Sequence, residues 1–83
     1  MAAKPPRLTA DQVRAARALL RWSQKDLADA SNVSVPTIAR LELGHGALAG
    51  TEQTAAALRK ALEEAGVVFI DQGDGGGVGV RFG

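Results

Sequence analysis

The chain has 83 residues and therefore room for one domain, because independent hydrophobic cores become marginal below about 60 residues. It contains no cysteine, which excludes disulfides and thiolate metal sites. The net charge of +1 hides an asymmetry, since residues 1–40 carry seven basic and three acidic side chains, whereas residues 41–83 carry three basic and six acidic ones. A basic N-terminal half is a weak electrostatic indication of a polyanionic partner.

Residues 1–7 are predicted to form a flexible basic arm, because Pro5 and Pro6 oppose helix formation and no apolar alternation is present there. No apolar segment approaches the length of a signal-peptide core or a membrane span. We therefore expect a protein of the reducing cytoplasm that has no membrane partner.

The first helix is predicted to begin after Thr9, because Thr9 and Gln12 have the spacing of a capping box. Apolar residues then recur at helical spacing through about Trp22. Arg14, Arg17 and Arg21 form a stripe beside this apolar face. Such a stripe is either a solvated face or a set of phosphate contacts.

Two short helices should follow, separated by a tight turn. Ser23 and Asp26 repeat the capping pattern and open a helix over residues 24–30. The turn falls at Asn32, a residue type that tolerates the left-handed backbone conformation, and Ser34 caps the next helix. That helix places Pro36 in its first turn and runs until about Gly44.

A fourth helix is predicted from its cap at Thr51 to about Ala65, with Gly66 as its C-terminal stop. The hydrophobic period then changes from helical to alternating, so that residues 67–70 and 78–82 are predicted to form a β-hairpin around a glycine-rich loop. The predicted fold is thus mainly α, a four-helix bundle with a C-terminal hairpin. We divide it into the arm at 1–7, the helical domain at 8–66 and the hairpin at 67–83.

The two short helices carry the functional motif. It consists of the run S-Q-x-x-L-A at residues 23–28, the run V-S-x-x-T-I-x-R-x-E at residues 33–42, and Gly44. From about Leu8 to Ala65 the chain resembles the lambda-repressor and Cro family of helix-turn-helix domains, the xenobiotic-response-element type of bacterial regulators. It departs from the family's pattern at Asn32, where glycine is usual, and in the added hairpin.

The resemblance implies a sequence-specific DNA-binding regulator that reads the major groove with its third helix. The base-facing positions are then Ser34, Val35, Pro36, Thr37 and Arg40. Arg40 is the best candidate for guanine, because its planar fork can pair with O6 and N7. The alternative is a surface arginine paired with Glu42 or Asp29.

Other polar residues near this motif are candidates for phosphate contacts. The resemblance gives Gln24 a phosphate contact and a role in bracing the recognition helix. The remaining candidates are Arg14, Arg21, Lys25 and His45. An exposed loop residue is the alternative for His45.

Arg17 and Glu42 are assigned differently, because each lies beside core residues on its helix. A structural ion pair between the first and third helices fits this placement, and the resemblance implies the same pairing. We therefore exclude Arg17 from the DNA contacts.

The sequence offers no site for a metal, a cofactor or catalysis. His45 is the single histidine and has no cysteine or second histidine at ligand spacing. The glycine-rich stretch at 73–77 lacks the ending of a phosphate-binding loop. Since no nucleophile, base and orienting residue can be assembled, we expect neither an enzyme nor a bound small-molecule effector.

A homodimer is expected, because helix-turn-helix proteins usually bind two half-sites about 10–10.5 base pairs apart. The hairpin is the candidate dimerisation element, since an isolated two-stranded ribbon is marginally stable and has open edges. Its candidate buried face consists of Val67, Phe69, Val78, Val80 and Phe82. The alternative is that the hairpin folds over its own bundle.

Two other functional classes remain open. One is an antitoxin or accessory regulator, which binds its operator but has another protein as its main partner. The other is an interaction module whose helix-turn-helix no longer binds DNA. In that module the basic arm and Arg40 would be dispensable.

Overall fold

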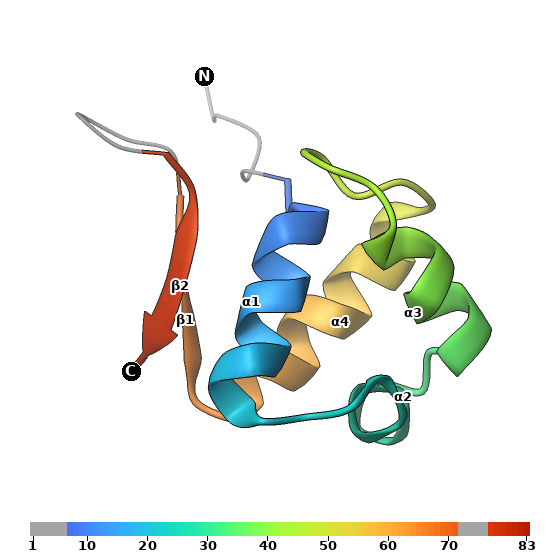
Figure 1. Cartoon of the computed structure of the whole chain (residues 1–83), viewed down its shortest axis with the longest axis horizontal. Coiled ribbons are helices and arrows are strands. Elements are labelled where there is room, and N and C mark those ends of the chain that lie inside the picture. The colour runs from blue at the N-terminus through green and yellow to red at the C-terminus, as the bar shows by residue number, and fades with distance from the viewer. Residues whose placement is uncertain (1–6, 72–76) are drawn as a thin grey trace.

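Four helices and a two-stranded antiparallel hairpin follow one another in the computed structural model, which describes residues 7–71 and 77–83 (Figure 1). The helices are α1 (Ala10–Leu20), α2 (Gln24–Ser31), α3 (Val35–Glu42) and α4 (Glu52–Glu64), and the strands are β1 (Val67–Ile70) and β2 (Gly79–Phe82). This architecture confirms the predicted fold class. The predicted basic arm falls on residues 1–7, of which 1–6 lie outside the described residues.

Each helix begins directly after the hydroxyl residue that the sequence marks as its cap. The side chains of these residues accept a hydrogen bond from the backbone N–H three positions later, and they are Thr9, Ser23, Ser34 and Thr51. In α1 and α2 the bond is reciprocated by Gln12 and Asp26, which completes two capping boxes. The helix starts are therefore set locally by the sequence.

The end of α1 differs from the prediction. We expected this helix to reach Trp22, but it ends at Leu20, because Arg21 adopts the left-handed conformation with φ of 58°. Glycine is the residue that usually occupies such a cap, so an arginine there gives no sequence signal. At the end of α2, Asn32 has the left-handed conformation that we predicted, with φ of 60°.

One hydrophobic core joins the four helices and β1, and Val80 of β2 packs against it. It is built from the inward residues of the helices, from two residues of β1 and from Leu8 and Leu48 in the connecting segments: Leu8, Ala10, Val13, Ala16, Leu27, Ile38, Leu41, Leu48, Ala55, Leu58, Ala61, Leu62, Val67 and Phe69. Figure 1 shows α1 and α4 in the middle of the molecule, with the hairpin on one side and α2 and α3 on the other. The hairpin and α3 therefore lie at opposite ends of the longest axis, which measures 35 Å.

The hairpin packs against its own bundle. Its strands pair in the register Val67 with Phe82 and Phe69 with Val80. β2 begins at Gly79, one residue later than predicted. Buried Gln12 on α1 donates from Nε2 to the carbonyl oxygens of Ile70 and Gly79, at 3.3 and 3.1 Å.

This packing corrects the dimer interface that strand alternation suggested. Val67 and Phe69 are buried in the core of their own chain, at 2 and 8% exposure, and Val80 packs against that core. The guanidinium of Arg59 lies 5.0 Å from the centre of the Phe69 ring, over its face. For these three hairpin residues the alternative holds, in which the hairpin folds over its own bundle.

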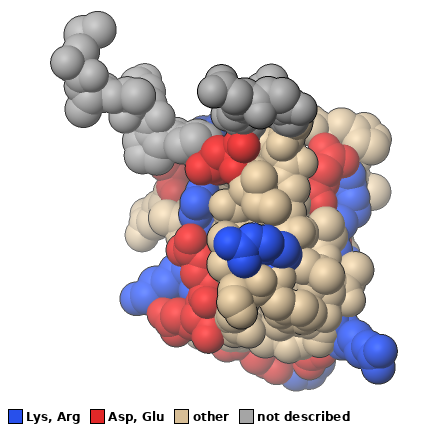
Figure 2. Space-filling model, turned by 90° about the vertical axis from the view of Figure 1, so that its left-hand side faces the viewer, with Lys and Arg blue, Asp and Glu red and all other residues tan. Residues whose placement is uncertain are grey.

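Part of the hairpin still exposes apolar surface. Ile70 and Val78 are each 42% exposed, and Phe82 is 52% exposed. Figure 2 shows the outer side of the hairpin as a mainly uncharged area crossed by one basic side chain, with acidic side chains beside and below it. Two of the five dimer candidates, Val78 and Phe82, therefore remain accessible.

Arg7 does not belong to a free arm. Its guanidinium donates to the carbonyl oxygen of Leu48 from Nε at 2.9 Å and from Nη2 at 2.7 Å, and to that of Gly50 at 3.1 Å. The segment that precedes α1 is thereby tied to the loop between α3 and α4. Within the described residues, no helix is long and apolar enough to cross a membrane.

Candidate nucleic-acid interface

The helices α2 and α3 are joined by a short turn that fixes the angle between them. Leu27 on α2 and Ile38 on α3 are fully buried, and partly buried Val33 packs against the same core from within the turn. Ser31 supports the turn, since its hydroxyl donates to the carbonyl oxygen of Leu27 at 2.7 Å and accepts from the Val33 N–H at 3.2 Å. The inner faces of both helices are thus anchored, which leaves the N-terminal turns of α3 on the surface.

The N-cap and the outer face of α3 carry the five residues that we predicted to face bases. Ser34, Val35, Pro36 and Arg40 are exposed, and Thr37 is half-buried. The Ser34 hydroxyl is used in capping α3 and lies 2.9 Å from the Thr37 hydroxyl. Among the described residues, the Arg40 side chain forms neither a hydrogen bond nor an ion pair, and Lys25 and Arg17 hold the two acids suggested as its partners. Its guanidinium is therefore available to an external acceptor.

Arg17 of α1 and Glu42, the last residue of α3, form an ion pair. Nε and Nη2 of Arg17 donate to the two carboxylate oxygens of Glu42, at 2.7 and 2.6 Å. The Arg17 Nη1 also donates to the Trp22 carbonyl oxygen at 2.9 Å, which links the pair to the segment that leads into α2. The Glu42 side chain is 5% exposed and that of Arg17 is 21% exposed. This bidentate geometry joins α1 to the end of α3.

Gln24 completes this junction from α2. Its Nε2 donates to the Glu42 carboxylate at 3.2 Å. Burial raises the pKa of Glu42, but the hydrogen bonds from Arg17 and Gln24 outweigh burial and hold that pKa below its ordinary value. The hydrogen bond to Glu42 also raises the pKa of Arg17. Glu42 is therefore an ionised group on which α1, α2 and α3 converge.

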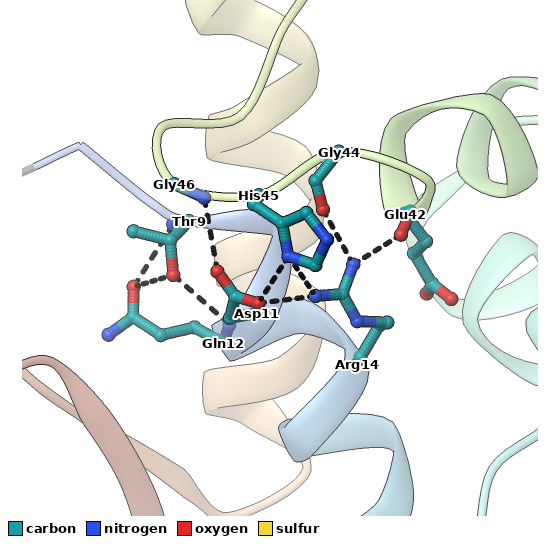
Figure 3. A network of polar contacts seen from close by, with 8 residues as sticks. All are labelled: Thr9, Asp11, Gln12, Arg14, Glu42, Gly44, His45 and Gly46. Atoms are coloured by element: carbon teal, nitrogen blue, oxygen red, sulfur yellow. Dashed lines mark hydrogen bonds and ion pairs between the residues drawn. The ribbon is translucent and has the colours of Figure 1, made fainter.

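The other phosphate candidates lie in different environments. Lys25 is exposed and pairs with Asp29 one turn later on α2, at 3.0 Å. Arg21 is exposed at the end of α1, and the His45 side chain is 86% exposed in the loop that follows α3. The Arg14 side chain is 33% exposed and bonds within the chain to that same loop (Figure 3).

Two features of this surface were missed by sequence reasoning. Leu43, directly after α3, is 82% exposed, although its apolar character would have favoured burial. The usable signal was its spacing, since Leu43 lies five residues after Ile38 and so falls off the inward face of the helix. The bonds from Arg14 to the carbonyl oxygens of Glu42 and Gly44 were also missed, because backbone acceptors leave no mark in a sequence.

Comparisons with known proteins bear on the same segment. A family model described as "Helix-turn-helix" matches residues 13–65, which begin within α1 and extend just past the end of α4. The search of curated proteins gives no match. The matched residues include the Arg17, Gln24 and Glu42 junction and the whole outer face of α3.

Proposed function

The chain belongs to the helix-turn-helix family of DNA-binding regulators, of the XRE and lambda-repressor type, which is not a family of enzymes. We propose that it is a transcriptional repressor that reads a palindromic operator as a homodimer. The observation that carries this proposal is the outer face of α3. It combines an exposed, uncommitted arginine at position 40 with the apolar side chain of Val35. This combination suits the edges of base pairs in a major groove.

Arg40 is assigned to the reading of guanine. A guanidinium can donate two parallel hydrogen bonds to O6 and N7 of guanine, and each such pair discriminates by about 1–3 kcal/mol against the wrong base. Val35 and Thr37 are assigned to apolar contact with a thymine methyl group. Pro36 has no N–H, so it shapes the first turn of α3 and reads no base by hydrogen bonding.

Lys25, Arg21 and Gln24 are assigned to the DNA backbone. Lys25 and Gln24 lie in the first turn of α2, where free backbone N–H groups and the helix dipole favour an anionic group. Gln24 already donates one hydrogen bond to Glu42 at the end of α3. The Gln24 side chain would therefore link α3 to any phosphate that Gln24 also contacts. These contacts set affinity and register and carry no sequence information.

Homodimerisation is part of the proposal, because one recognition helix covers only half of a palindromic site. Ile70, Val78 and Phe82 are the exposed apolar side chains assigned to the contact between chains. Pairing of the hairpins edge to edge about a two-fold axis perpendicular to the sheet would keep both bundles on the same side of the shared sheet. In that arrangement the two α3 helices point in the same direction, whereas face-to-face pairing would direct them apart.

The test is a genome-fragment selection with purified protein at near-physiological salt, followed by competition against random duplex DNA. We expect a palindrome, and we expect Arg40→Ala to lose about tenfold or more of its discrimination at one base pair of each half-site. Lys60→Ala, an exposed cation on α4, is the matched control and should leave discrimination unchanged.

Binding that is uniform across sequences and steeply salt-dependent would contradict the proposal, since it would leave only phosphate attraction. The main partner would then be sought among proteins. Recovery of a non-palindromic site would contradict the homodimer alone.

A further inference from the structure

The loop that follows α3 is fastened to the first turns of α1 (Figure 3). Nη1 of Arg14 donates to the carbonyl oxygens of Glu42 and Gly44, the latter at 2.8 Å. The last carbonyl groups of a helix have no partner within the helix, and a cation near them interacts favourably with the helix dipole. Arg14 therefore caps the C-terminus of α3 from another helix.

Asp11 holds both the arginine and the loop. Its carboxylate accepts from Nη2 of Arg14 and from the Gly46 N–H at 3.0 Å, and it lies 3.3 Å from Nδ1 of His45. The hydrogen bond from Gly46 and then that from His45 are the main reasons why the pKa of Asp11 lies below its ordinary value. Asp11 thus remains ionised beside Arg14 at neutral pH.

Backbone bonds next to this cluster fix the same loop. The Ala10 N–H donates to the Gly46 carbonyl oxygen and the Leu48 N–H donates to that of Leu8, both at 2.9 Å. The start of α1 and residues 46–48 therefore run side by side. The side chains of Asp11 and Arg14 extend this attachment from the loop to the last residue of α3.

These contacts give Arg14 a different role from the one that a basic stripe suggested. A guanidinium has five N–H donors, and those of Arg14 reach three acceptors of its own chain, one of which is a carboxylate that offsets its charge. Arg21 and Lys25 lack such a set of backbone acceptors among the described residues, since the single bond of Lys25 goes to exposed Asp29.

We propose that Asp11 and Arg14 are positioning residues for the recognition helix, which act on DNA through the end of α3 and do not themselves contact phosphate. This inference rests on the proposed function. It predicts that breaking the cluster lowers affinity for the operator while leaving affinity for random duplex nearly unchanged. A phosphate contact would lower both.

Asp11→Ala is the discriminating variant, because the two roles predict effects of opposite sign. If Arg14 contacts phosphate, removal of the neighbouring carboxylate strengthens binding to all DNA. If the pair positions α3, Asp11→Ala weakens operator binding by about tenfold, comparable to the loss of one base contact. Tighter binding of the operator by Asp11→Ala would overturn the proposal.

Salt dependence supplies the second readout. Each phosphate contact contributes about 0.9 to the slope of log K against log salt concentration for duplex DNA. On random duplex we expect Arg14→Ala to keep the wild-type slope and the control Lys25→Ala to reduce it by about that amount. A reduced slope for Arg14→Ala would assign the residue to phosphate and overturn the proposal.

Measurements without DNA separate this inference from the proposed function. Amide hydrogen exchange at Gly46 should become faster in Asp11→Ala, because its hydrogen-bond acceptor is lost, while circular dichroism shows the helices intact. If the wild-type protein selects no operator, the proposed function fails. In that case, unchanged exchange at Gly46 in Asp11→Ala would also overturn the attachment of the loop after α3 to α1. Faster exchange in this variant would support that attachment.

Discussion

The two sides of α1 are attached to their neighbours by different forces. Toward α3 the attachment is polar and directional, through Arg17 with Glu42 and through Arg14 with the loop that follows α3. Toward the hairpin it uses the neutral hydrogen bonds from Gln12 to the carbonyl oxygens of Ile70 and Gly79, while the hairpin itself is anchored to the bundle by apolar burial of Val67 and Phe69. Charge-assisted bidentate bonds restrict an angle more strongly than apolar contact does, whereas apolar burial contributes stability with little orientation. The helix that we propose to read DNA is thus held by the directional kind.

The largest effect should come from breaking the Arg17 and Glu42 pair. We expect Glu42→Gln to lower the free energy of unfolding by about 3 kcal/mol, because the arginine is left half-enclosed without its carboxylate. Urea denaturation measures this loss. Glu63→Gln, an exposed acid paired with Arg59 on α4, is the matched control and should cost less than about 1 kcal/mol. A double-mutant cycle with Arg17→Met that shows no coupling would contradict the assignment.

The same pair should make the free energy of unfolding depend on pH in the acid range. Because the pKa of folded Glu42 lies below its ordinary value near 4.5, its contribution is fully present above that pH and is lost as pH falls through the folded pKa. The wild-type protein should therefore lose more stability than Glu42→Gln below about pH 4.5. Parallel curves for the two proteins would show that the carboxylate is not stabilised by folding.

The hairpin side should respond less and in two separable ways. Phe69→Leu should cost about 1–2 kcal/mol in unfolding, through imperfect repacking and loss of the Arg59 contact to the ring, and should leave self-association unchanged. Phe82→Ser, its matched counterpart on exposed surface, should change unfolding by less than about 0.5 kcal/mol and weaken the dimer in sedimentation experiments. Undiminished dimerisation in Phe82→Ser would remove this residue from the interface.

The smallest effect should appear at the end of α1. Arg21→Gly should raise the free energy of unfolding by about 1 kcal/mol or less, because glycine relieves the left-handed conformation that arginine adopts there. The same variant should bind DNA more weakly if Arg21 contacts phosphate. Thermal unfolding measures the change in stability, and titration of random duplex DNA measures the change in affinity. An Arg21→Gly variant less stable than the wild type would contradict the expected stabilisation.

Much of the fold could be predicted from the sequence because its signals are local. The hydroxyl caps of all four helices, the two capping boxes and the turn at Asn32 depend on residues within four positions of one another. The early end of α1 could not be predicted, since Arg21 occupies a backbone region for which arginine has no preference.

The less predictable features depend on which segments meet in space. Alternation in the hairpin indicates an apolar face but not what covers it, so burial of Val67 against the chain's own bundle could not be distinguished from burial in a dimer. The bonds from Arg14 to the end of α3 and its following loop join residues 28 and 30 positions apart and end on backbone oxygens. By contrast, both partners of the Arg17 and Glu42 pair are charged side chains with inward spacing, which left a readable pattern.

The attachment of α3 to α1 through its inner face and C-terminal end has a consequence for how DNA-binding preference can change. Val35 and Arg40 take no part in holding the helix, and both are exposed, so substitutions there should alter stability by only about 0.5 kcal/mol. Altered operator preference can then arise by exchange of a few surface side chains while the buried junction stays intact. This separation would make the chain a practical scaffold for selecting new target sequences from small libraries.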